Sequence, residues 1–211
     1  MEIRWTEEDV IEELVEEFGE EYRDDIERTL SLTKGKWAKW GLCGSVKIGR
    51  FRYTIIKDEN EAVEIAKAVV IQYLDEEPET FSESFLRDYI YITETDKRLL
   101  IADEEVYIRD EVETEAEDMD FETEEAKKRW IEEEVDKRIE EFKKGLEDPV
   151  EYFVYELGLY TFEELLKQPW IRIDYDRAAE QAVVLDGWEH FLTDDGKSYV
   201  TKNGLVYFRE Y

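Results

Sequence analysis

The chain has little of several residue types on which common protein functions depend. Its 211 residues include one histidine, one cysteine and three prolines. A single cysteine, Cys43, excludes a disulfide framework and is typical of a reducing compartment. These counts also exclude zinc sites built from histidine and cysteine. The sequence shows neither a signal-peptide-like apolar segment nor an apolar run long enough to cross a bilayer. We therefore expect a cytoplasmic protein that does not enter a membrane.

Motifs for catalysis and cofactor binding are also missing. The chain has no glycine-rich phosphate-binding loop, and residues 174–176 and 194–196 lack the full spacing of a calcium loop. His190 lies in a sequence context typical of a packed or capping residue, and Cys43 would act as a nucleophile only if His190 approached it across the fold. A two-carboxylate hydrolase stays open, but nothing singles out a pair. We expect no enzyme, no cofactor and no metal site.

What the chain has in excess is negative charge. It contains 58 Asp and Glu residues against 28 Lys and Arg, which gives a net charge of −30. Such a charge argues against direct binding to nucleic acid or to an anionic membrane. The hydrophobic fraction of 42% and the aromatic fraction of 14% predict a folded protein, because a disordered acidic tail would be poor in aromatic residues.

The acidic residues concentrate between Asp103 and Glu125, where thirteen carboxylates accompany one basic residue, Arg109. If this segment is helical, it rises ~1.5 Å per residue and carries roughly one carboxylate per 2.7 Å, against one phosphate charge per ~1.7 Å of duplex DNA. A second acidic helix beside it would reach the charge density of DNA. Residues 124–147 are the candidate, although basic residues alternate with acids there.

We predict that this acidic stretch is a partner-binding surface that acts collectively, through its field and spacing. Exposed charge pairs contribute well under ~1 kcal/mol each, so no single carboxylate should be essential. The predicted surface consists of Asp103, Glu104, Glu105, Asp110, Glu111, Glu113, Glu115, Glu117, Asp118, Asp120, Glu122, Glu124 and Glu125.

The spacing of apolar, capping and turn residues predicts an α+β fold in three parts. An N-terminal α+β lobe, residues 1–120, contains a β-hairpin packed with helices. A long amphipathic helix follows over residues 121–147 and contributes to a helical middle. A C-terminal helix–β-hairpin lobe occupies residues 148–211, where Asn203-Gly204 gives the strongest hairpin pattern in the chain.

Two helices are predicted in the helical middle. The first spans about residues 96–118, and its expected buried positions are Leu99, Leu100, Val106 and Val112. The second is capped by Thr123 and carries an apolar stripe at helical spacing, formed by Trp130, Ile131, Val135, Ile139, Phe142 and Leu146.

A basic segment stands apart from these acidic regions. Residues 31–57 contain seven Lys and Arg residues and no acid, whereas residues 1–30 hold thirteen acids and three bases. Basic residues interleaved with aromatic ones can mark a nucleic-acid surface. The favoured interpretation is that this hairpin neutralises acidic parts of its own chain.

The C-terminal part carries a resemblance to known proteins. The sequence DPVEYFVYELGLYTFEELLKQPWIRIDYDRAAEQAVVLDGWEHFL, followed by DGKSYVTKNGLVYFREY, resembles the C-terminal part of small acidic proteins encoded by bacteriophages. Its helix–glycine–helix progression, with Asp174, Tyr175 and Ala178, is similar to that of antirestriction proteins of the ArdA type, whose members mimic DNA. The resemblance covers residues 148–211 and does not extend to the N-terminal half. It implies a phage origin and action in the cytoplasm of a host cell.

Three classes of function compete. The first is a DNA-mimic inhibitor that occupies the basic nucleic-acid channel of a host defence or transcription protein. The second is an acidic structural or protein-interaction protein without mimicry. The third is an enzyme, which would need a pocket where His190 or converging carboxylates meet. We favour the first, with a basic host protein as the partner and a homodimer as one alternative for assembly. Carboxylates in two rows at duplex-like spacing would indicate mimicry, whereas scattered ones would indicate the second class.

Overall fold

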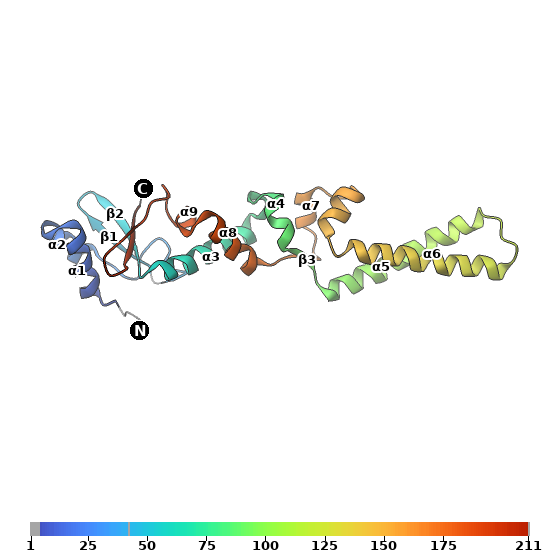
Figure 1. The fold of residues 1–211 in the computed structure, drawn as a ribbon, viewed down its shortest axis with the longest axis horizontal. Helices are drawn as coiled ribbons and strands as arrows, with labels where there is room; N and C mark the ends of the chain where they lie inside the picture. The colour runs from blue at the N-terminus through green and yellow to red at the C-terminus, as the bar shows by residue number, and fades with distance from the viewer. Residues whose placement is uncertain (1–4, 42, 211) are drawn as a thin grey trace. The chain divides into compact units, whose positions relative to one another are not determined.

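The computed structural model describes residues 5–41 and 43–210, which form two compact units (Figure 1). The first unit combines the described residues up to Glu77 with those from Tyr175 onward, and the second spans Pro78–Asp174. The fold class is α+β, as predicted, with an N-terminal hairpin, a helical middle and a C-terminal hairpin. The units differ from the three consecutive segments expected from the sequence, because a C-terminal strand pairs with the N-terminal hairpin.

A four-stranded antiparallel sheet organises the first unit. Its strands follow the order β1-β2-β6-β5 and comprise β1 (Cys43–Ile48), β2 (Phe51–Ile56), β5 (Tyr199–Val200) and β6 (Val206–Glu210). β1 and β2 form the predicted N-terminal hairpin, with Gly49 at positive φ in its turn. β5 and β6 form the predicted C-terminal hairpin. β6 also pairs with β2, so that Phe208 lies opposite Thr54.

Helices cover both faces of this sheet. On one face, α1 (Glu7–Phe18), η1 (Glu20–Tyr22) and α2 (Arg23–Thr29) bury Leu14 and Ile26 against Val46 and Ile55. Side chains alternate between the faces of a strand, so Phe208 lies on the other face, where its ring is 6.4 Å from that of Trp188. That face is covered by α3 (Glu59–Glu76) and α9 (Trp188–Leu192), and α8 (Tyr175–Asp186) packs against these two helices.

The second unit is built around a helical hairpin. Its two helices, α5 (Glu94–Glu117) and α6 (Glu124–Gly145), lie side by side and are joined by residues 118–123 (Figure 1). Thr93 and Thr123 cap the two helices by accepting backbone N–H groups of Asp96 and Ala126. The short elements of this unit are η2 (Pro78–Thr80), α4 (Glu83–Leu86), η3 (Arg87–Tyr89), β3 (Ile90–Ile92), the π-helix η4 (Glu151–Glu156), α7 (Phe162–Leu166) and β4 (Ile171–Ile173), and β3 pairs with β4.

The buried residues of the helical hairpin confirm the predicted apolar stripe of α6. The buried side of α5, which we call its phase, differs from the predicted one. Ile108 and Val112 of α5 are buried with Val135 and Ile139 of α6. The prediction that Leu99 and Val106 are buried is wrong, because they are 61% and 68% exposed, and Leu100 is only half-buried. The residues that meet α6 follow the series Ile101, Ile108 and Val112. That phase turns Leu99 and Val106 outward.

The burial of Ile108 and the exposure of Val106 predict different effects of substitution on stability. We expect Ile108→Ala to lower the free energy of unfolding of the second unit by about 2–4 kcal/mol, because it removes buried side-chain atoms and leaves a cavity. Val106→Ala should cost about 0.5 kcal/mol or less, because that side chain is exposed. Urea denaturation followed by circular dichroism measures both effects. Equal losses in the two variants would contradict the phase of α5.

Candidate partner-binding surface

The thirteen predicted carboxylates lie on three consecutive parts of the helical hairpin. Glu104 is half-buried, and the other twelve side chains are exposed. Eight belong to α5: Asp103, Glu104, Glu105, Asp110, Glu111, Glu113, Glu115 and Glu117. Three belong to the loop between the helices: Asp118, Asp120 and Glu122. Two, Glu124 and Glu125, belong to the first turn of α6. The structure therefore keeps them in one continuous region.

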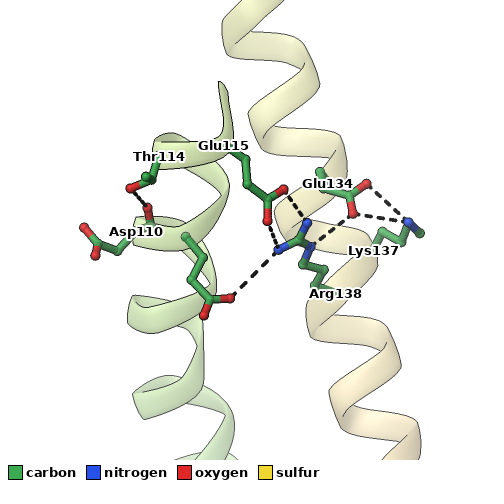
Figure 2. A network of polar contacts seen from close by, with 7 residues as sticks. Asp110, Thr114, Glu115, Glu134, Lys137 and Arg138 are labelled. Carbon is green, nitrogen blue, oxygen red and sulfur yellow. Dashed lines mark hydrogen bonds and ion pairs between the residues drawn. The ribbon is translucent and has the colours of Figure 1, made fainter. Parts of the chain in front are cut away.

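Arginine residues neutralise part of this region. Arg138 of α6 donates two hydrogen bonds to Glu115 of α5, at 3.0 and 2.6 Å, and a third from its Nε to Glu134 at 3.1 Å (Figure 2). Its guanidinium also lies 3.9 Å from Glu111. The sequence shows Arg138 only as one of many alternating charges on a helix, because its contact with Glu115 depends on how the two helices pair.

Arg138 is therefore expected to stabilise the helical hairpin. Arg138→Gln should lower the free energy of unfolding by about 1–2 kcal/mol, because it removes a two-hydrogen-bond contact between helices and leaves neighbouring carboxylates to repel one another. The loss should shrink at ~1 M salt, where the Debye length is ~3 Å. Lys143→Gln is the control: among the described residues its ammonium pairs only with Glu140, one helical turn away. A loss that salt leaves unchanged would contradict the electrostatic explanation.

Two further carboxylates of α5 have particular surroundings. Glu105 forms an ion pair with Arg109 at 3.6 Å. Burial raises the pKa of Glu104, and the nearby Glu111 raises it further. The fold thus opposes the charge of Glu104.

Nine carboxylates remain, and we call them the acidic edge. No ion pair within the described part of the chain reaches Asp103, Asp110, Glu113, Glu117, Asp118, Asp120, Glu122, Glu124 or Glu125. Asp103, Asp110 and Glu117 repeat every seven residues and share the outward side of α5 with Glu113, away from the buried Ile108. The acidic edge thus combines one row along α5 with the loop that follows it and the first turn of α6.

The second helix does not double this charge. α5 carries ten acids and three bases, whereas α6 carries eight acids and seven bases. The two helices do lie side by side, as the idea of a DNA-like pair requires, but α6 is almost neutral. The net negative charge is therefore concentrated on α5 and the connecting loop.

The basic segment partly neutralises its own unit. Lys36 pairs with Asp194 at 3.3 Å, and Arg52 lies 3.9 Å from Glu210. The ammonium of Lys39 lies over the Trp40 ring, 3.7 Å from its centroid. The two ion pairs agree with the interpretation that this segment offsets acidic neighbours.

The two residues with catalytic potential differ in character. Cys43 lies on β1 and is fully buried, and burial raises the pKa of its thiol to about 11, which disfavours the reactive thiolate. His190 is exposed on α9 beside the ring of Phe191. Across the residues that the structure describes, no three or more His, Cys, Asp or Glu side chains converge in a way that could hold a metal ion.

No protein-family model, curated protein or solved structure matches this chain. In the described residues, no helix combines the length and the apolar character needed to cross a membrane.

Proposed function

We propose that this protein is a DNA-mimic inhibitor, which binds the nucleic-acid channel of a basic host protein through its acidic edge. The observation that carries the proposal is the set of nine exposed carboxylates without an ion pair among the described residues. A channel lined with Lys and Arg attracts such a surface for the same reason that it attracts phosphates.

The geometry of α5 supports binding to a basic channel. Residues seven apart on a helix are separated by about 10.5 Å along its axis, and Glu113 falls between Asp110 and Glu117. The row therefore presents successive negative groups within reach of adjacent basic side chains in a channel. Because the carboxylates act together, association should be fast and strongly dependent on salt.

One observation favours a second candidate function. The near-neutral α6 leaves a single acidic row, whereas a duplex presents two. A single row would suit an acidic interaction protein that binds a basic groove without imitating DNA. The two functions differ in whether duplex DNA competes better than a generic polyanion.

Competition distinguishes these functions. The full chain is immobilised, proteins from a bacterial lysate are captured at low salt, and each captured protein is challenged with duplex DNA or with polyglutamate at equal charge concentration. Mimicry predicts release by moderate salt and displacement by duplex DNA at much lower concentrations than by polyglutamate. Equal displacement by both polyanions would favour the second function. Capture that resists ~1 M salt, where exposed charges are largely screened, would contradict both.

A further inference from the structure

The first unit, which does not contain the acidic edge, has a cavity of about 270 Å³ with aromatic walls. Four rings line it: Phe18 at the end of α1, Tyr53 on β2, Tyr199 on β5 and Tyr207 on β6. This volume is just below the roughly 300–1,000 Å³ of drug-sized ligand sites, which are concave and combine aromatic walls with a few polar groups. It has room for one ring and a small substituent.

Contacts among the rings fix part of this wall and leave part accessible. Phe18 meets Tyr53 and Tyr207 edge-on, with ring centroids 5.1 and 5.3 Å apart. Tyr207 is buried and its hydroxyl donates a hydrogen bond to Glu17 at 2.8 Å. Tyr199 stacks on Tyr207 at 5.3 Å but is 51% exposed. The buried ring thus supports an exposed one, which is available to stack with a ligand.

Two cationic side chains line the same cavity. The guanidinium of Arg209 lies over the Phe51 ring, 3.6 Å from its centroid, which holds it in place. The ammonium of Lys197 makes no hydrogen bond or ion pair with any residue that the structure describes. One carboxylate, that of Asp195, also lines the cavity and accepts the backbone N–H of Lys197 at 3.1 Å. The lining therefore carries more positive than negative charge, in a chain whose net charge is −30.

Polar donors in the cavity are available as well. Within the described residues, the hydroxyl groups of Tyr53 and Tyr199 have no hydrogen-bond partner. Together with the Lys197 ammonium they form a set of donors next to stacked rings. A hydrogen bond from a cation to an anionic oxygen is about twice as strong as one between neutral groups.

We propose that this cavity binds a flat aromatic ring that carries one anionic group, either a carboxylate or a phosphate monoester. The ring stacks against Tyr199 and meets the edge of Tyr53, and the anionic oxygens accept hydrogen bonds from Lys197 and a tyrosine hydroxyl. Aromatic walls also attract quaternary ammonium groups, but Lys197 and Arg209 repel a cation here. This site is independent of the acidic edge and of the function proposed for it.

Calorimetric titration of the full chain tests the site with four probes. Phenyl phosphate and 4-hydroxybenzoate supply the ring and the anion, cyclohexyl phosphate lacks the aromatic ring, and benzyltrimethylammonium reverses the charge. We expect saturable binding of at least one aromatic anion with a Kd of about 1 mM or lower, the range open to so small a ligand. The preferred anion identifies the ligand as a carboxylate or a phosphate monoester.

Variants then assign the binding to this cavity. Lys197→Gln should weaken binding about tenfold, as expected for the loss of one charge-assisted hydrogen bond. Tyr199→Ala should weaken it through the loss of stacking. Lys202→Gln is the matched control, because it removes the same charge from an exposed residue that does not line the cavity. The melting temperature of each variant reports its folding. The proposal is overturned if neither aromatic anion saturates the protein, if Lys197→Gln has no effect, or if cyclohexyl phosphate or the cation binds equally well.

Discussion

Replacing Asp110, Glu113, Glu117 and Asp118 together by lysine should reduce binding to the basic partner by about a hundredfold or more at low salt. Each replacement exchanges an attraction for a repulsion, and four changes of somewhat under ~1 kcal/mol each combine to that factor. These four carboxylates are exposed and make no ion pair in the described part of the chain, so the fold should be retained. Glu111 and Glu115 are left unchanged, because they lie against Arg138.

A matched control variant distinguishes the effect of where the charges lie from the effect of the net charge of the protein. Glu132, Glu133, Asp136 and Glu141 of α6 are exposed and likewise have no ion pair among the described residues. Their reversal changes the net charge equally but leaves the acidic edge intact. We expect this control to lose much less affinity, and the single change Glu113→Gln to lose only a few-fold at most.

The measurement is affinity against salt concentration for the wild type and both variants, with melting temperature as the check on folding. The wild type should lose affinity steeply between low and moderate salt, and the acidic-edge variant should show a much shallower dependence. Equal losses in the two fourfold variants would show that only net charge matters. An unchanged affinity in the folded acidic-edge variant would show that the acidic edge is not the binding surface.

Phe208→Ala should lower the free energy of unfolding of the first unit by about 3–5 kcal/mol, a large loss for a single substitution. Phe208 is 1% exposed, lies on β6 opposite Thr54 of β2 and contacts Trp188 of α9. Its removal therefore leaves a cavity where the C-terminal strand meets the N-terminal hairpin. Chemical denaturation with amide hydrogen exchange measures the effect in each unit.

The second unit provides an internal reference for this experiment. Exchange in α5 and α6 should be unchanged in Phe208→Ala, because those helices belong to the other unit. Val200→Ala, on the edge strand β5, should cost about 0.5 kcal/mol or less because that side chain is 47% exposed. A loss below about 1 kcal/mol in Phe208→Ala would contradict the role of β6 as an internal strand.

Local patterns in the sequence predicted the elements well because their causes are local. The Thr-x-x-acid pattern forms a capping box at Thr6 and Asp9, and it forms another at Thr161 and Glu164. Both hairpins also follow from their turn residues. The pairing of Thr54 with Phe208 could not be predicted, because strand register between distant segments depends on the packing of both faces.

The phase of α5 was harder to predict than its existence. Charged residues leave few apolar positions on this helix, and Val106, Tyr107 and Ile108 are adjacent, so the sequence alone admits more than one buried side. Packing against Val135 and Ile139 selects Ile108. The same pairing brings Arg138 to Glu115, so the sequence located the acidic region but not which of its charges are neutralised. The aromatic cavity escaped prediction because its walls come from α1, β2, β5 and β6.

The discontinuous first unit has a consequence for synthesis on the ribosome. Residues 78–174 emerge before the chain reaches β6, so the second unit can fold while the first still lacks the strand that pairs with β2. Until residues 206–210 are released, β2 presents an unpaired edge to other nascent chains. Translation that stops short of residue 206 therefore leaves a folded helical hairpin attached to an incomplete sheet, a substrate for chaperones or proteases.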